Sequence, residues 1–344
     1  MKIVVFGGSG QIGYPLVDKL SKEHQVTVIH RTPKYEMSLM GVRQIIADVS
    51  KVSPELWQNL KELHPDVIVH LLANNEFRAK QFVDNCKDLC RKVVVLSSCE
   101  IYSAFACYLK DTDGPIEPSP IKESDQTRRY IDRNFVSSDI YKKLTSSNGY
   151  SCLEAEINLF TQNHFQCTIL RAAPLFGPSP STLQFCSFFC RDDNHKDFCI
   201  NEKFLTCMSD ITFIDNLVEG IRWAIFENTP ENVIYNLSSL KKFSFVELLQ
   251  IIAKELDWKG CIGLSQSLEL DFNLNQSIAL DMTKICQAGY KELYSVEEAV
   301  KKTLKYEKTQ YLFLKTEDNN FKIPDDVVWY KLQTMTKSTI FNKH

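Results

Sequence analysis

Three glycines near the amino terminus have the spacing of a phosphate-binding loop. Gly7, Gly10 and Gly13 lie in "VVFGGSGQIG", directly after an apolar run and before a helical pattern. The first glycine permits a tight turn, the second lets a diphosphate approach the backbone, and the third lets the helix pack closely. The N–H groups at the helix start would hold the diphosphate of a dinucleotide, with Gln11 and Ile12 inside the loop. The alternative is an ordinary turn between a strand and a helix.

The end of the second apolar run bears on which dinucleotide would bind. A site selective for NAD usually has a carboxylate there, which binds the ribose 2′-hydroxyl. In this chain the run ends "VIHRT", so His30 holds the acidic position and Arg31 follows it. A guanidinium suits a 2′-phosphate, which favours NADP over NAD, although Arg31 could also be a solvated loop charge. Asp48, which closes "IIAD", could accept a hydrogen bond from the adenine amino group or cap the next helix.

A tyrosine stands at the start of another candidate helix, "NGYSCLEAEINLF". Free tyrosine has a pKa of about 10, so Tyr150 would need a nearby cation to act as a base at neutral pH. Where a lysine would supply that cation, four residues later, the chain has Glu154. A carboxylate so close would raise the pKa of the tyrosine. The stretch therefore predicts an altered acid–base site or only a helix start.

Tyr141 is an alternative acid–base group. It lies in "SSDIYKKL" and is followed by Lys142 and Lys143. If the helix begins earlier than the periodicity indicates, one of these lysines could supply the positive charge that Tyr150 lacks. The sequence leaves three possibilities open, which are Tyr150, Tyr141 or neither.

The elements that would position these residues alternate between short apolar runs and helical patterns. The runs are too apolar for strands with one solvated face, so they predict a parallel sheet buried on both sides. Such alternation predicts a doubly wound α/β fold whose ligand-binding loops gather at the carboxyl edge of the sheet. The runs are residues 2–6, 25–30, 43–49, 66–73, 92–98 and 167–173.

Composition and charge argue against several other classes of protein. The 344-residue chain is 44% hydrophobic and 24% charged, as ordinary globular proteins are, and its net charge is −3 with no basic block. These values give no reason to expect binding to nucleic acid or to a membrane surface. No apolar run reaches the roughly 18–20 residues of a membrane span. The cysteines form no C-x-x-C pair, so we expect free thiols, no metal site and a cytoplasmic protein.

Several further segments, in their order along the chain, resemble the extended short-chain dehydrogenase/reductase family, the NAD(P)-dependent epimerase/dehydratase group. The resemblance covers about residues 1–305. It rests on "FGGSGQIG", "HLLANN" (70–75), "VVVLSSCEIYSAF" (93–105), "LRAAPLFGP" (170–178), "ITFIDNLVEGI" (211–221) and "YNLSS" (235–239).

This resemblance implies a Rossmann-type sheet with a smaller carboxyl-terminal lobe that binds substrate. We expect the dinucleotide-binding domain over residues 1–175, interrupted by a long polar excursion at 103–149 that would run over the strand ends. The lobe would take most of residues 176–344, with segments near 207–240 returning to the sheet.

The resemblance also implies roles for residues at the strand ends. In the family a serine or threonine holds the substrate oxygen; this role falls on Ser98, four residues before Tyr102, with Ser97 as the substitute. Leu72 and Ala73, in the segment after the fourth strand, would line the coenzyme. A tyrosine acts as the general acid–base group for hydride transfer at an alcohol carbon, and a lysine four residues later lowers its pKa.

Two further residues are expected to bind substrate. Arg171 could hold a phosphate or carboxylate of the substrate, or form an internal ion pair. Asn216 stands where the family has a second aspartate. The implied activity is NAD(P)-dependent oxidation, reduction or epimerisation of a nucleotide sugar or similar small metabolite, by a possible homodimer. The missing lysine keeps two alternatives open, a coenzyme-binding sensor or scaffold, and a lyase or isomerase that reuses the site with Glu154 or Tyr150 as its base.

Overall fold

A computed structural model gives the fold and the side-chain contacts of most of the chain. It describes residues 1–51, 53–87, 89–110, 115–128, 148–179, 197–268, 272–310 and 326–332. The polar segment that contains Tyr141, Lys142 and Lys143 lies outside the described residues.

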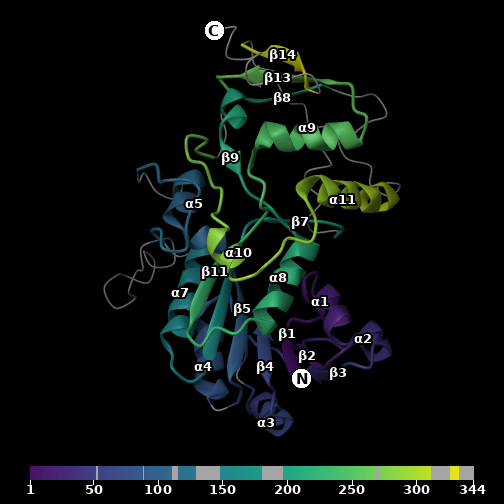
Figure 1. Cartoon of the computed structure of the whole chain (residues 1–344), viewed down its shortest axis with the longest axis vertical. Helices are drawn as coiled ribbons and strands as arrows, with labels where there is room; N and C mark the ends of the chain where they lie inside the picture. Colours follow the sequence, from purple (N-terminus) through teal and green to yellow (C-terminus); the bar gives the residue numbers. More distant parts are fainter. Residues whose placement is uncertain are drawn as a thin grey trace.

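A seven-stranded parallel sheet forms the centre of the larger part of the protein (Figure 1). Its order is β11–β6–β5–β4–β1–β2–β3. The strands are β1 (Lys2–Phe6), β2 (Gln25–His30), β3 (Arg43–Ile46), β4 (Val67–His70), β5 (Lys92–Ser98), β6 (Gln166–Ala172) and β11 (Val233–Leu237). Because β1 pairs with β2 on one side and with β4 on the other, the strand order reverses at β1. The predicted doubly wound α/β fold is confirmed, and the glycine loop follows the strand at this switch point.

Helices cover both faces of the sheet, as the continuous apolar strands predict. Alternate residues of β1 point to opposite faces, so Ile3 and Val5 belong to one core and Val4 and Phe6 to another. On the first face lie α1 (Gly13–Leu20), α2 (Tyr35–Leu39), α8 (Ile214–Phe226) and α10 (Thr283–Gln287). On the second face lie α3 (Pro54–Leu63), α4 (Glu76–Cys86) and α7 (Asn148–Thr161).

A smaller lobe with its own core lies at the end of the molecule away from α3 (Figure 1). Its helix α9 (Phe245–Glu255) begins with a capping box, in which Ser244 and Glu247 each satisfy the other's backbone N–H. The other elements are α11 (Val296–Gln310), η4 (Glu202–Leu205) and a sheet of β8 (Phe198–Asn201), β13 (Cys261–Ser265) and β14 (Val328–Lys331). The short pairs β7 (Leu175–Phe176) with β10 (Thr212–Phe213), and β9 (Met208–Ser209) with β12 (Phe243–Ser244), complete the fold. The domain boundaries given above stay a prediction.

The described part of the polar excursion lies near the carboxyl end of β5. The short helix η1 (Cys99–Ile101) leads into it, and it starts with α5 (Ser103–Tyr108), a helix that the sequence pattern does not predict. The apolar residues of α5 are buried in a fourth core together with Cys152 of α7. Burial therefore makes a helix of a segment that has no clear periodicity. In the described parts of the chain, we find no helix with the length and apolar character of a membrane span.

Candidate coenzyme and substrate site

The fold of the glycine loop requires glycine at some of its positions but not at all of them. Gly7 has φ +83°, a conformation that side chains rarely adopt. A Cβ atom on Gly13 would lie 2.3 Å from the carbonyl oxygen of Gly7, so no side chain fits there. A Cβ atom on Gly10 would meet only that same oxygen, at 3.4 Å. The fold thus requires glycine at positions 7 and 13, whereas the bare backbone at Gly10 fits the close approach of a diphosphate.

Two other residues of the loop connect it to its surroundings. Ile12 caps the start of α1, whose N-terminus faces the loop. Gln11 accepts a hydrogen bond through its side-chain oxygen from the hydroxyl of Ser179, at 3.0 Å. Ser179 lies shortly after β7, on the way into the lobe. The loop is therefore joined both to α1 and to the segment that leads to the smaller lobe.

The segment after β4 lies against the glycine loop. The Cγ atom of Leu72 is 2.9 Å from the place that a Cβ atom on Gly7 would take. Ala73 is buried next to it. The structure therefore brings Leu72 and Ala73 to the predicted coenzyme loop, and their coenzyme-lining role stays a prediction.

His70 holds this segment in place. Its ring is 2% exposed, stacks on Phe6 with ring centroids 4.6 Å apart, and meets the edge of the Phe82 ring at 4.8 Å. Its Nδ1 atom accepts a hydrogen bond from the backbone N–H of Leu72. Burial, with a smaller effect from the charge of Arg78, lowers the pKa of His70 to about 3. The ring is therefore neutral in the folded protein at every physiological pH.

This burial predicts a loss of stability in acid. The unfolded chain binds a proton at His70 near the ordinary pKa of 6.5, and the folded chain does not until about 3. The stabilisation is therefore complete above about pH 6.5 and is lost progressively below it, at about 1.4 kcal/mol per pH unit. Urea unfolding measures the free energy of unfolding at pH 7.5 and at pH 5. Between these two pH values, the decrease should be about 2 kcal/mol smaller for His70→Gln than for the wild type. The same change at the exposed His164 should leave the wild-type pH dependence intact; equal slopes for His70→Gln and the wild type would contradict the assignment.

The end of β2 carries the residues that would meet the adenosine ribose. His30 is 5% exposed, and neither of its ring nitrogens has a hydrogen-bond partner among the described residues. Burial lowers the pKa of His30, while the neighbouring amide of Gln44 raises it to a smaller extent without reaching hydrogen-bond geometry. Arg31 is exposed. The Asp48 carboxylate accepts hydrogen bonds from the hydroxyl and backbone N–H of Ser50, so it is engaged in the turn after β3.

The end of β5 brings two serines and a carboxylate to the same edge of the sheet. The hydroxyl oxygen of Ser98 accepts the backbone N–H of Glu100 at 3.2 Å, a contact that does not use the hydroxyl proton. The buried hydroxyl oxygen of Ser97 makes no hydrogen bond within the described residues. Glu100 is half-buried and was missed by the sequence analysis, although its position two residues after Ser98 could have indicated it. Its charge contributes to the raised pKa values of the thiols Cys99 and Cys152, for both of which burial is the larger cause.

Helix α7 brings no lysine to the site. Tyr150 lies in its first turn, and Glu154 is buried further along it. Cys152 is 3% exposed, and burial raises the pKa of its thiol to about 12. This thiol is therefore neutral and supplies no positive charge. The acid–base roles of Tyr150, Tyr141 and Glu154 stay predictions.

Arg171 forms a buried ion pair, the alternative that the sequence left open. Its guanidinium binds both carboxylate oxygens of Glu156 on α7, with distances of 2.8 to 3.2 Å. It also donates to the phenolic oxygen of Tyr102 at 3.0 Å, and Tyr102 donates to Asn236 at 2.7 Å. The side chains of all four residues are almost fully buried. Arg171 is thus engaged within the fold in this geometry, and its role in binding substrate stays a prediction.

This buried network also fastens part of the polar excursion to the sheet. Glu123 accepts the backbone N–H of Asn236 through its carboxylate at 2.8 Å, and its backbone carbonyl accepts from Arg171. The side-chain amide of Asn236 donates to the carbonyl of Ile121 at 2.9 Å. Residues 121–123 are therefore held at the carboxyl end of β11. Burial raises the pKa of Tyr102, so its hydroxyl stays neutral and acts as a link in the network.

Asn216 has its amide groups engaged by the loop that precedes α11. Its oxygen accepts the backbone N–H of Tyr294 at 2.9 Å, and its nitrogen donates to the carbonyl of Tyr294 at 2.8 Å and to Glu292 at 3.4 Å. The side chain is 3% exposed. This amide therefore joins α8 to the lobe, and the expected contact with substrate stays a prediction.

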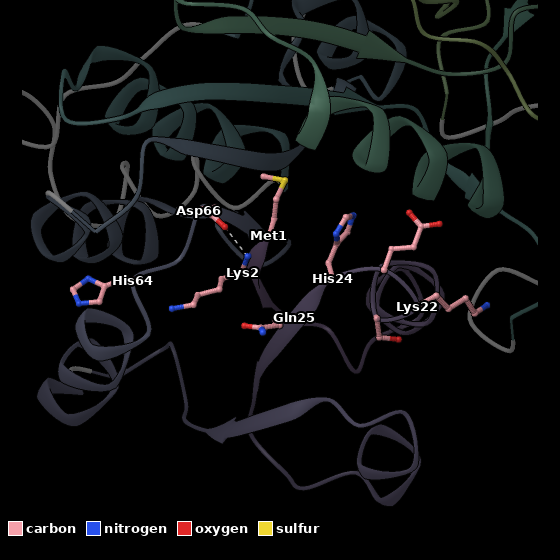
Figure 2. Close-up of a pocket in the computed structure, with 9 residues that line it drawn as sticks. Met1, Lys2, Lys22, His24, Gln25, His64 and Asp66 are labelled. Atoms are coloured by element: carbon pink, nitrogen blue, oxygen red, sulfur yellow. Dashed lines mark hydrogen bonds between the residues drawn. The ribbon is translucent and has the colours of Figure 1, made fainter.

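A surface depression at the other edge of the sheet does not belong to this site (Figure 2). It has a volume of about 550 Å³ and is lined at the amino ends of β1 and β2 by Lys2, His24 and Gln25, among others. Asp66 accepts the backbone N–H of Lys2 there at 2.7 Å. Since the glycine loop follows the carboxyl end of β1, the depression lies at the opposite edge and has no part in binding the dinucleotide.

The comparison with known families agrees with this geometry. Residues 3–238 match the profile of the NAD dependent epimerase/dehydratase family, which is more than half of the chain. The chain belongs to this family. Its segments from the glycine loop to β11 are the part that the family shares.

Solved structures show the same fold at low sequence identity. MoeE5 in complex with UDP-glucuronic acid and NAD is 16% identical, with a TM-score of 0.66 over 90% of this chain and 100% of that one. UDP-glucuronic acid 4-epimerase from Bacillus cereus in complex with NAD is 18% identical, with a TM-score of 0.63 over 90% and 100%. UDP-N-acetylglucosamine 4-epimerase from Bacillus cereus is 16% identical, with a TM-score of 0.66 over 89% and 99%. A search of curated proteins found no match.

Proposed function

We propose that this family member is an enzyme that binds a nicotinamide dinucleotide at the glycine loop and acts on a hydroxyl or keto carbon of a nucleotide sugar. One observation carries the proposal. The bare backbone at Gly10 and the hydroxyl of Ser98 both lie at the carboxyl edge of one parallel sheet, after β1 and at the end of β5. The names of the structural neighbours, which are complexes or epimerases of UDP-sugars, support the substrate class.

The chain's own residues would orient the reacting carbon and move its proton. When bound, the nicotinamide supplies a hydride acceptor and donor. Ser98 would donate its hydroxyl proton to the substrate oxygen, and Ser97, with its buried and unbonded hydroxyl oxygen, is the substitute. Tyr150, or Tyr141 in its place, would take the proton from the substrate hydroxyl. Glu154 remains a candidate base for the alternative in which a lyase or isomerase reuses the site.

The end of β2 supports NADP as the preferred coenzyme. No carboxylate follows this strand, and Arg31 offers a permanent positive charge for a 2′-phosphate. The neighbours named above that are complexes contain NAD. We therefore propose NADP first and NAD as the alternative.

One observation favours a second candidate function, a coenzyme-binding protein without turnover. Helix α7 carries no lysine, and the buried Cys152 is a neutral thiol. A tyrosine without a nearby cation is a weak base at neutral pH. A lyase or isomerase that reuses the site is a further alternative.

The expected homodimer stays a proposal that surface residues support. Helices α4 and α7 pack together, and they expose Phe77, Ile157 and Phe160. Large apolar side chains at the surface of two adjacent helices are typical of a contact between subunits. The cytoplasmic location also stays a prediction.

Binding and turnover separate the two candidate functions. The purified protein should change the fluorescence of NADPH or NADH on titration, and it should convert at least one UDP-sugar in a panel analysed by chromatography. Ser98→Ala should keep coenzyme affinity and lower kcat by roughly 100-fold, as the loss of a single hydrogen-bond donor to a reacting oxygen does. Ser21→Ala, at the opposite edge, is the matched control. Binding without turnover in the wild type would favour the sensor or scaffold; no binding of either coenzyme would refute both.

A further inference from the structure

A cleft at the amino edge of the sheet lies between the strands β1, β2 and β3 and the end of α3. Its volume is about 350 Å³, and it adjoins the depression of Figure 2, with which it shares Lys2 and Gln25. The apolar part of its wall includes Val4, Val42, Leu63 and Pro65. Since the glycine loop follows the carboxyl end of β1, this cleft is separate from the proposed coenzyme site.

Three polar side chains of the cleft point to the same face of the sheet. They are Lys2 of β1, Thr27 of β2 and Arg43 of β3. Each lies two residues before a side chain that packs in or against the second core, namely Val4, Ile29 and Ile45. Residues two apart on a strand share a face, and neighbouring strands are about 4.8 Å apart. Because Thr27 is also the register partner of Arg43, the three polar groups meet at one end of this face.

The hydroxyl of Thr27 has no hydrogen-bond partner within the described residues, although Thr27 is only 7% exposed. Buried polar side chains nearly always have a partner, which is another group of the chain, a water molecule or a ligand. Thr27 lines the cleft. Its hydroxyl can therefore donate to a group that is bound there.

The charges of the cleft suit an anion. The side chain of Arg43 is exposed and makes no hydrogen bond or ion pair in the part of the chain that the structure describes. The Nζ atom of Lys2 donates to the carbonyl of Leu63 at 3.1 Å, which leaves two of its three N–H groups. Within the described residues, no carboxylate lines the cleft. Asp66 lines the neighbouring depression, where its carboxylate accepts the backbone N–H of Lys2.

From this arrangement we propose that the cleft binds the phosphate group of a small organic phosphate ester. Arg43 and Lys2 bind phosphate oxygens, and Thr27 donates its hydroxyl proton to another. The organic part of the ligand lies against Leu63 and Pro65. A phosphate ester carries nearly two negative charges at neutral pH and balances both cations, whereas a carboxylate balances only one. This site goes beyond the proposed function and does not depend on it.

Phenyl phosphate is the probe that tests this site, because its ring can contact the apolar wall. Isothermal titration calorimetry uses the full chain with excess NADPH, which keeps the glycine loop occupied. Phenyl phosphate should bind at least tenfold more tightly than benzoate, which has the same ring and a single charge. Failure of phenyl phosphate to bind, or equal affinities for the two probes, would overturn the proposal.

Three variants locate the bound phosphate. Arg43→Gln should weaken phenyl phosphate by roughly tenfold or more, which is the loss of one charge-assisted hydrogen bond. Thr27→Val, which keeps the shape of the side chain, should weaken it by roughly fivefold or more. Arg91→Gln is the matched control, because it removes the same charge just before β5, outside the cleft. Equal affinities for the wild type, Arg43→Gln and Thr27→Val would contradict the site.

Methyl NMR of the unmutated protein guards against misfolding of the variants. Phenyl phosphate should shift the methyl signals of Val42 and Leu63 at the cleft and leave those of Val17 and Val28, which contact the glycine loop, in place. Shifts at Val17 and Val28 alone would place the ligand at the loop and overturn the proposal. The proposed function fails separately, by absence of coenzyme binding, and that outcome leaves the shifts at Val42 and Leu63 as a valid test.

Discussion

Gly10→Ala should leave the protein folded and remove its affinity for the dinucleotide. A methyl group at this position would meet only the carbonyl oxygen of Gly7, at 3.4 Å, so the loop has room for it. A bound diphosphate would have to approach the same backbone and would be pushed away from the N–H groups of the loop. Each charge-assisted hydrogen bond lost would weaken binding by roughly 10- to 100-fold. Fluorescence titration with NADPH and NADH measures the effect, and thermal unfolding checks the fold.

Two glycine variants give the matched controls for Gly10→Ala. Gly13→Ala should destabilise the protein itself, because its Cβ atom would lie within 2.6 Å of backbone atoms of Gly7 and Gly8. Gly41→Ala should leave coenzyme affinity unchanged, since Gly41 is in a turn before β3 and its Cβ atom would meet nothing within 4 Å. Its φ of +69° predicts only a modest loss of stability. If Gly10→Ala bound the coenzyme as the wild type does, the loop would not be the diphosphate site.

Arg171→Met should destabilise the protein by about 3–5 kcal/mol. The ion pair with Glu156 is buried, with both side chains 5% exposed, and the change leaves the carboxylate without its partner. The replacement also removes the donor to Tyr102 and to the carbonyl of Glu123. We therefore expect residues 115–128 to become more accessible to proteases. Urea unfolding measures the free energy of unfolding.

A double variant and a surface pair distinguish charge burial from a general effect of mutation. Arg171→Met combined with Glu156→Leu should recover much of the loss, because no unpaired charge then stays buried. Arg222→Met, which breaks an exposed pair with Glu219, should change stability by no more than about 1 kcal/mol. A cost for Arg171→Met as small as that for Arg222→Met would contradict a buried network.

The parts of the site that could be predicted from the sequence are those whose physical requirement is local. The glycines of the loop are contiguous with the strand and helix that they join. The steric need for each glycine arises from nearby residues in the chain, so it can be recognised in a short segment. The apolar runs predicted the parallel sheet for the same reason, since burial on both faces needs apolar residues at every position. Ser98 is the last residue of the apolar run 92–98 and of β5, but its role came from the resemblance to the family and stays a prediction.

The parts that could not be predicted depend on which distant segments meet. Arg171 had two possible roles in the sequence, and its ion pair forms because α7 brings Glu156 to its guanidinium and the segment after β5 brings Tyr102. Asn216 was expected to contact substrate, and the loop at Tyr294 engages it instead. Helix α5 was missed because it forms by burial against α7 rather than by its own periodicity.

By itself, the sequence determined the α/β sheet, the place of the glycine loop and the absence of a lysine four residues after Tyr150. Those features depend on neighbours in the chain, for which steric limits and hydrophobic periodicity act over a few residues. Only the tertiary structure decided which polar groups are used within the fold and which remain for a ligand. Whether a polar group is used or left for a ligand depends on its desolvation. A side chain is desolvated by the residues that pack over it, and these can be distant in the sequence. The buried ion pair at Arg171 and the hydroxyl oxygen of Ser97, which has no hydrogen-bond partner among the described residues, are the two outcomes of that one cause.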